Sequence, residues 1–238
     1  APFFHLRCGL SMILTISNIL NADEVQRAQA LLQDAPWEDG RATAGVTSAL
    51  VKNNQQLPFD CAASRAIGEM VVQGLERSSQ FFAAALPHRL YTPRINRYAG
   101  GENYYGAHVD GAIRRVMPSG ERVRTDVSCT VFLAEPDSYE GGELVFTQGS
   151  LTHAIKLPAG SVVVYPGDTV HEVRPVTRGA RLAAFFWVQS LVRCQVQRRM
   201  LYELDQSISA LRERQPDAAE VVSLTGHYHN LLRMWAET

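Results

Sequence analysis

In the first third of the chain, apolar residues recur at helical spacing in two stretches, which a short strand precedes and a polar segment separates. Residues 12–20 are predicted to form a strand, and Asn21 then caps a predicted helix that runs to about Asp34, because apolar residues recur three and four positions apart. Residues 38–58 are polar and are predicted to be a loop, whereas apolar residues return at helical spacing across 60–84. This part of the chain is therefore predicted to be a mainly helical layer.

From about residue 88 the hydrophobic pattern changes to that of short β-strands. Gly, Pro and Asp turns separate the predicted strands, which are residues 94–98, 125–133, 143–146, 152–157, 161–165, 171–173 and 181–189. No helical pattern comes between them, which favours an antiparallel sandwich or barrel over a parallel sheet.

After Ser190 the helical period returns in two stripes that Pro216 separates. The first stripe is Met200, Leu204, Ile208 and Leu211, and the second is Val221, Leu224, Tyr228, Leu231 and Trp235. These stripes suit either a homodimer contact or packing onto the β core. The chain is thus predicted to be α+β, with a mainly β core between two helical parts.

Composition and charge exclude several classes of function. The 23 basic and 24 acidic residues give a net charge of −1, and basic runs are absent, so neither a nucleic-acid partner nor a membrane partner is expected. No apolar stretch approaches the roughly 18 residues of a membrane span. The four cysteines lie far apart without a CxxC pair, which indicates reduced thiols in a cytoplasmic protein. Residues 1–11 lack the pattern of a secretory signal, and we expect them to be an upstream or non-native extension before a natural start at Met12.

The charge pattern of the β-rich region gives no sign of an anionic substrate. Between residues 89 and 181, ten Arg and one Lys stand against ten acidic residues, so the local balance is 11 − 10 = +1. The Asn-Gln run at 53–56 is expected to face solvent rather than to line a substrate mouth.

The candidate chemistry begins with one tripeptide and one distant histidine. His108 and Asp110 are two positions apart, so on a strand their side chains point to the same side and can reach one ion. His171, 61 positions after Asp110, can supply a third ligand if its strand lies opposite in the same barrel. Two imidazoles and one carboxylate with open positions form the facial triad of non-haem Fe(II) oxygenases. Taken alone, each of these elements is more often structural than metal-binding.

Arg181 strengthens the metal interpretation. An antiparallel return from His171, through a turn at 177–179, would bring Arg181 back beside the metal. A buried Arg at that place could pair bidentately with a carboxylate of a bound dicarboxylic acid. The alternative is a surface salt bridge, and Arg178 is equally suited to that role.

The arrangement of these residues resembles that of the Fe(II)- and 2-oxoglutarate-dependent dioxygenases. Further motifs of the prolyl hydroxylase-like branch are NRYAGG at 96–101, YEGGEL at 139–144, LPAG at 157–160 and YP at 165–166. The bacterial PKHD-type hydroxylases are matched more closely, at residues 37–44, 52–57, 176–181, 185–187 and 224–232. The resemblance covers residues 12–238.

The resemblance implies a fold and a ligand set. The fold is a double-stranded β-helix (jelly-roll) with an N-terminal helical layer, in which residues 12–190 form the dioxygenase domain, the β core spans about 88–190, and residues 191–238 form a C-terminal helical extension. The implied Fe(II) ligands are His108, Asp110 and His171. Arg181 is expected to hold the distal carboxylate of 2-oxoglutarate, with Tyr98 as a further contact to this co-substrate.

The resemblance also implies an activity. The enzyme would hydroxylate an unidentified small-molecule or peptidyl substrate with molecular oxygen, while 2-oxoglutarate is decarboxylated to succinate. Family members are described as ascorbate-dependent, and bacterial members are associated with iron uptake and homeostasis.

Two other readings share the metal ligands. One is an iron- or oxygen-responsive sensor of the same fold that contacts partners through its helical tail. The other is a cupin-like metalloenzyme without 2-oxoglutarate, in which Arg181 would point away from the metal cavity. Arg181 favours the dioxygenase over the sensor, because a sensor needs no anchor for a dicarboxylate.

Overall fold

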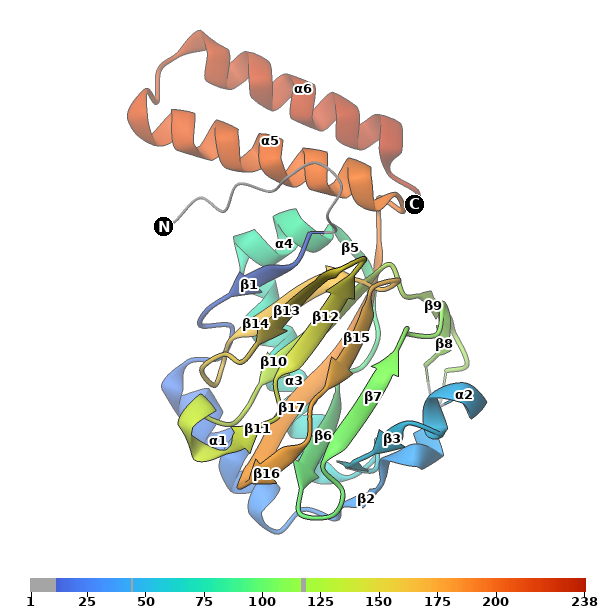
Figure 1. The fold of residues 1–238 in the computed structure, drawn as a ribbon. Coiled ribbons are helices and arrows are strands. Elements are labelled where there is room, and N and C mark those ends of the chain that lie inside the picture. The colour runs from blue at the N-terminus through green and yellow to red at the C-terminus, as the bar shows by residue number, and fades with distance from the viewer. Residues whose placement is uncertain (1–11, 44, 117–118) are drawn as a thin grey trace.

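Two antiparallel sheets face each other at the centre of the computed structural model, which describes residues 12–43, 45–116 and 119–238 (Figure 1). The larger sheet runs in the order β1 (Leu14–Ile16), β14 (Val162–Pro166), β10 (Val127–Phe132), β17 (Ala180–Ser190), β6 (Arg94–Ala99), β4 (Gln55–Gln56) and β2 (Glu38–Asp39), and β5 (Pro87–Leu90) also pairs with β17. The smaller sheet runs in the order β13 (Leu151–Ile155), β12 (Leu144–Gln148), β15 (Val170–Val173), β7 (Tyr104–His108) and β3 (Lys52–Asn53). This is the double-stranded β-helix expected from the sequence. The predicted extension, residues 1–11, lies outside the described residues.

Two short strand pairs and the helices complete the described structure. The pairs are β11 (Glu140–Gly141) with β16 (Val176–Arg178), and β8 (Ile113–Arg115) with β9 (Arg122–Arg124). The helices are α1 (Ala22–Gln33), α2 (Val46–Ala49), α3 (Ala62–Glu76), α4 (Ser79–Ala85), α5 (Gln195–Arg214) and α6 (Ala219–Trp235), with 3₁₀ turns at Gly40–Thr43 and Pro136–Ser138. None of the helices in the described part of the chain is both long and apolar enough to cross a membrane.

The larger sheet is buried on both faces. Its outer face packs against α1 and α3, where Ala28 and Ile67 join Val131 and Val162 in one core. Its inner face packs against the smaller sheet in a second core, which includes Phe132, Val163 and Tyr165 from the larger sheet and Leu144, Phe146 and Val173 from the smaller. This double burial explains why every residue of β10 is buried, including the polar Ser128 and Thr130, which line the cavity between the sheets.

The N-terminal part differs in detail from the prediction. Asn21 caps α1 as expected, in a capping box with Glu24. The helical stretch predicted for 60–84 is two helices, because Ser78 begins a new helix by accepting a hydrogen bond from the Phe81 amide. The predicted loop at 38–58 is wrong in part: it contributes β2 and β4 to the larger sheet and β3 to the smaller one.

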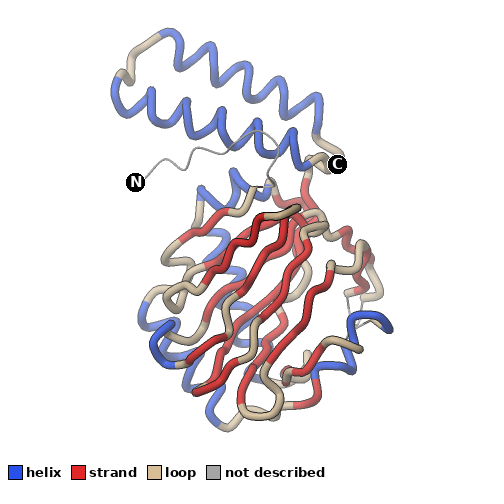
Figure 2. Tube along the Cα trace, in the orientation of Figure 1, coloured by secondary structure: helices blue, strands red, loops and turns tan. Residues whose placement is uncertain are grey.

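The helical hairpin α5–α6 lies at one end of the β core, apart from the helices that cover the larger sheet (Figure 2). Its two predicted stripes face each other and share a third core with Leu86 and Val192, rather than spreading over the β core. The prediction is wrong for Met200, which is 49% exposed, and its neighbour Leu201 is buried in this core instead. The buried Arg198 guanidinium fastens α5 by donating hydrogen bonds to the carbonyls of Val192, Arg193 and Asp126. Among the described residues, Cys61, Cys129 and Cys194 are free thiols.

Gly179 forms the turn that leads from β16 into β17. Its φ of +73° lies in the left-handed region, and a Cβ there would meet the Ser138 carbonyl oxygen and the Tyr139 backbone. Only glycine fits both conditions, so this residue fixes where β17 starts and hence where Arg181 lies.

We predict that Gly179→Ala lowers the free energy of unfolding by about 2–3 kcal/mol, because left-handed strain and steric overlap add. Gly100→Ala is the matched control, since Gly100 has a φ of +57° but nothing within 4 Å of its Cβ position. The control should lose only about 1 kcal/mol. Urea titration of both variants measures the difference, and equal losses would show that the contact with Ser138 is unimportant.

Candidate metal centre and co-substrate pocket

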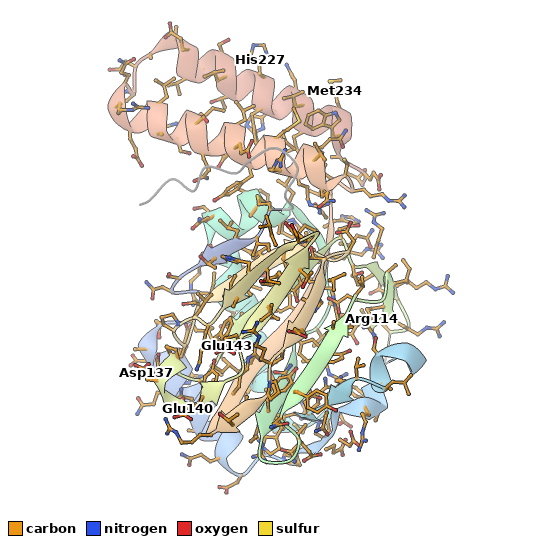
Figure 3. The ribbon with its side chains drawn as sticks, in the orientation of Figure 1. Arg114, Asp137, Glu140, Glu143, His227 and Met234 are labelled. Carbon is orange, nitrogen blue, oxygen red and sulfur yellow. The ribbon has the colours of Figure 1, made fainter. Side chains whose placement is uncertain are left out.

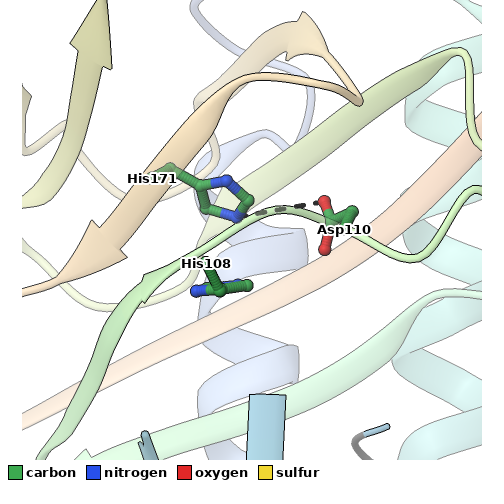
Figure 4. Close-up of side chains that lie close together, drawn as sticks. All are labelled: His108, Asp110 and His171. Carbon is green, nitrogen blue, oxygen red and sulfur yellow. Dashed lines mark ion pairs between the residues drawn. The ribbon is translucent and has the colours of Figure 1, made fainter. Parts of the chain in front are cut away.

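Two histidines from neighbouring strands and one aspartate from the segment after β7 converge on one point (Figure 4). His108 ends β7, and His171 lies opposite it in the β15–β7 register. Asp110 lies two residues beyond the end of β7, so the prediction that it shares a strand with His108 is wrong, although the chain still brings it to the same place. One ligand atom from each residue lies within 4.8 Å of the others, and His171 Nε2 is 3.9 Å from Asp110 Oδ2. This arrangement can hold a metal ion.

Backbone carbonyls orient both imidazole rings. The Nδ1 of His108 lies 2.8 Å from the Gly106 carbonyl oxygen, and the Nδ1 of His171 lies 2.9 Å from the Thr169 carbonyl oxygen. Because a carbonyl oxygen only accepts, each Nδ1 carries a proton, and the lone pair of a neutral ring then lies on Nε2. This tautomer presents Nε2 as the metal ligand.

The charge states also suit metal binding. Burial, followed by repulsion from His171, lowers the pKa of His108 to about 4, which leaves this ring neutral at physiological pH. Burial alone would raise the pKa of Asp110, but attraction to His171 and hydrogen bonds from Ser128 and Trp187 hold it below its usual value. A neutral imidazole and a carboxylate are the forms that bind a metal.

Arg181 lies on the facing sheet, and its surroundings are unusual for a charged group. It is 1% exposed, and all three guanidinium nitrogens are buried without a hydrogen-bond partner among the described residues. Its guanidinium carbon lies 5.3 Å from the centre of the Tyr98 ring and 5.1 Å from that of Phe132. A buried cation without a partner is strongly unfavourable, so this place is suited to an anionic ligand.

The route by which Arg181 reaches the cavity differs from the predicted hairpin. Instead of returning beside His171, the chain turns at Gly179 and crosses to the larger sheet, where Arg181 pairs in register with Tyr98. Arg178 instead makes an exposed ion pair with Glu140 at 2.9 Å. Of these two arginines, only Arg181 lines the cavity.

A cavity of about 770 Å³, including its open mouth, lies between the two sheets, and all five predicted site residues line it. Tyr98 lines the cavity, and its hydroxyl accepts a hydrogen bond from the Asn96 amide at 3.3 Å. Burial raises the Tyr98 pKa to about 12. This phenol therefore stays protonated and can donate to a bound anion.

Sequence reasoning missed one wall of the cavity. Lys52, Asn54 and Gln56 line it, although the Asn-Gln run was expected to face solvent. All three are buried, and they alternate with more exposed residues. Residues 52–56 are all polar, so the sequence carries no apolar–polar period that could have revealed this wall.

Comparisons with known proteins agree with this arrangement. A family model described as the 2OG-Fe(II) oxygenase superfamily matches residues 93–189, and one described as the PKHD-type hydroxylase C-terminal domain matches residues 196–237. A PKHD-type hydroxylase of Polaromonas sp. (strain JS666) is 59% identical over 95% of this chain and its own full length. Another, from Verminephrobacter eiseniae (strain EF01-2), is 52% identical, again over 95% of this chain and the full length of that protein.

Solved structures show the same fold at low sequence identity. A Trichoplax adhaerens prolyl hydroxylase, in complex with a hypoxia-inducible-factor peptide fragment, has a TM-score of 0.53 at 17% identity and covers 79% of this chain and 86% of its own. A non-haem α-ketoglutarate-dependent carbocyclase of nogalamycin biosynthesis has a TM-score of 0.54 at 16% identity. The match covers 76% of this chain and 80% of the carbocyclase chain.

Together, the fold and the family matches define a 2-oxoglutarate- and Fe(II)-dependent oxygenase, with oxygen and 2-oxoglutarate as co-substrates. Within that class, the chain belongs to the PKHD-type hydroxylases.

The Ser128 hydroxyl donates a 2.7 Å hydrogen bond to Asp110 Oδ2 and so orients this carboxylate. We predict that Ser128→Ala weakens Fe(II) affinity about tenfold, because partners of this kind hold metal ligands in place. Ser138→Ala, which removes an exposed hydroxyl bonded to the Glu135 carbonyl, is the control and should leave the affinity unchanged. Anaerobic Fe(II) titration measures both. Unchanged affinity in Ser128→Ala would mean that Asp110 needs no orientation by Ser128.

Proposed function

We propose that this hydroxylase binds Fe(II) through His108, Asp110 and His171, and binds 2-oxoglutarate through Arg181 and Tyr98. The observation that carries the proposal is the Arg181 guanidinium, which is buried without a hydrogen-bond partner in the described structure and lines the same cavity as the triad. Two imidazoles and one carboxylate match the chemistry of an Fe(II) centre that leaves positions open for a chelating co-substrate.

Each proposed residue has a distinct part in the reaction. The iron centre, when loaded with 2-oxoglutarate, supplies the oxygen activation that hydroxylates a C–H bond and yields succinate. The carbonyls of Gly106 and Thr169 hold the two imidazoles in one tautomer. Arg181 neutralises the distal carboxylate of 2-oxoglutarate and fixes its orientation, while the Tyr98 hydroxyl donates to the same carboxylate. The apolar surroundings of Arg181 exclude water from this pairing.

The proposed domain organisation separates the part of the chain that carries the site residues from the C-terminal helices. Residues 12–190, with the β core at about 88–190, would form the dioxygenase domain. Residues 191–238 would form a helical extension, which Arg198 holds against the β core.

Two substitutions separate iron binding from co-substrate binding. Under anaerobic conditions, the protein with Fe(II) and 2-oxoglutarate should show a visible charge-transfer band. Asp110→Ala should lose most iron affinity and the band, whereas Arg181→Ala should keep iron affinity but bind 2-oxoglutarate at least about tenfold more weakly. Both are measured by titration of the band and by iron content.

Arg178→Ala is the matched control, because Arg178 is exposed and paired with Glu140. It should bind iron and 2-oxoglutarate like the unaltered protein. Full iron affinity in Asp110→Ala would remove Asp110 from the ligand set. Unchanged 2-oxoglutarate affinity in Arg181→Ala would remove the proposed anchor.

On the family resemblance, we further propose that ascorbate returns oxidised iron to Fe(II), and that the cytoplasmic reaction serves iron uptake or homeostasis. The number of turnovers before inactivation should rise when ascorbate is added and remain low with Fe(II) and 2-oxoglutarate alone. Succinate release over time measures this, and identical total turnover in the two conditions would argue against a role for ascorbate.

A further inference from the structure

The cavity carries more positive charge than 2-oxoglutarate requires. Besides Arg181, it is lined by Lys52 of β3, Arg94 of β6 and Arg114 of β8, which we call the outer cationic cluster. The only acidic side chain among the described residues that line the cavity is Asp110. Arg114 lies beside the carboxyl end of β7, the strand that ends at His108 (Figure 3).

The members of the outer cationic cluster line one cavity, and Lys52 is affected electrostatically by both arginines. Burial lowers the pKa of Lys52 to about 7, and repulsion from Arg114 and then Arg94 adds to this effect. The Lys52 ammonium lies 5.4 Å from the centre of the Tyr105 ring. The Arg114 guanidinium lies 4.4 Å from the centre of the Trp187 ring. Arg181, in contrast, lies near the rings of Tyr98 and Phe132. Its register partner is Tyr98, four positions along β6 from Arg94, so these two arginines line different parts of the cavity.

The two arginines of the cluster lack counter-ions. Neither Arg94 nor Arg114 makes an ion pair or hydrogen bond through its side chain within the described structure, and the Nε of each is buried without a partner. The residues outside the described structure include no Asp or Glu. The chain therefore provides no hidden carboxylate to neutralise them.

A charge count shows that the loaded cavity remains cationic. Lys52, Arg94, Arg114 and Arg181 against Asp110 give 4 − 1 = +3. Fe(II) adds two charges and 2-oxoglutarate removes two, so +3 remains, or +2 with Lys52 neutral. The count of +1 for residues 89–181 missed this excess, because Lys52 lies outside that window and the window's acids other than Asp110 do not line the cavity.

We propose that the outer cationic cluster binds an oxyanion of the primary substrate, a carboxylate or a phosphate, and so selects acidic substrates for hydroxylation. The inference rests on the proposed function, since it assigns the second anion site of the same cavity. Guanidinium groups pair bidentately with either oxyanion. The rings of Tyr91 and Trp187, in edge contact 5.1 Å apart, provide an apolar surface beside Arg114 for the rest of the substrate.

Three probes with the same ring test the charge requirement. Phenylacetate, phenyl phosphate and the uncharged phenylacetamide are titrated calorimetrically into anaerobic protein that holds Fe(II) and saturating 2-oxoglutarate. At least one of the two acids should bind about tenfold or more tightly than the amide. Whichever of the two acids binds more tightly indicates whether the natural group is a carboxylate or a phosphate.

Single substitutions then locate the site. Arg94→Gln and Arg114→Gln should each weaken binding of the tighter-binding acid about tenfold while leaving 2-oxoglutarate affinity unchanged. Arg115→Gln is the matched control, because Arg115 adjoins Arg114 on β8 but is exposed and does not line the cavity. This variant should bind the acid like the unaltered protein.

The outcomes distinguish this inference from the proposed function. Equal affinity for acid and amide, no binding by either acid, or no loss in Arg94→Gln and Arg114→Gln would overturn the outer site. Loss of the charge-transfer band when the acid is added would also overturn it, since the acid would then displace 2-oxoglutarate. Absence of the band before any probe is added would instead count against the proposed function.

Discussion

The Arg181 guanidinium, 1% exposed and without a hydrogen-bond partner in the part of the chain that the structure describes, sets the strictest condition on this fold. The surrounding fold gives Arg181 little freedom to move. Cross-strand pairing with Tyr98 fixes it from one side, and the left-handed Gly179 fixes the start of its strand. Gly142 has a φ of +69°, and a Cβ there would come within 3.1 Å of the Arg181 Cδ. Because a buried unpaired cation destabilises the folded state, an oxyanion bound to Arg181 should raise the free energy of unfolding.

The two sheets divide the chemistry between them. The smaller sheet carries both histidines, on adjacent antiparallel strands, while the larger sheet carries Arg181 and Tyr98. The distance between the two histidines and Arg181 is therefore set by the packing of one sheet on the other. The shared core of Phe132, Phe146 and Tyr165 keeps that distance constant, because close-packed aromatic side chains tolerate little change in volume.

The sequence predicted features that depend on local or strongly periodic signals. The capping box of Asn21 and Glu24 is local, and the order of helical layer, β core and helical tail follows from the hydrophobic period. It did not predict that Asp110 lies beyond its strand, or that Arg181 comes from the facing sheet, because these depend on how distant strands pair. The two-residue strands β3 and β4 are too short for a clear period. The cationic excess was also hidden, since charge counted along the chain ignores which side chains share a cavity.

The two carbonyl-bound histidines that we propose as iron ligands have a further consequence for which metal the protein acquires. Their rings are already oriented without an ion, so the ligand set needs little rearrangement to accept one. Two imidazoles and a carboxylate do not discriminate against Ni²⁺, Cu²⁺ or Zn²⁺, all of which bind such donors more tightly than ferrous iron does. Correct metallation must then come from the relative availability of these ions where the chain folds, and a shortage of iron would leave the enzyme open to inactive substitution by its competitors.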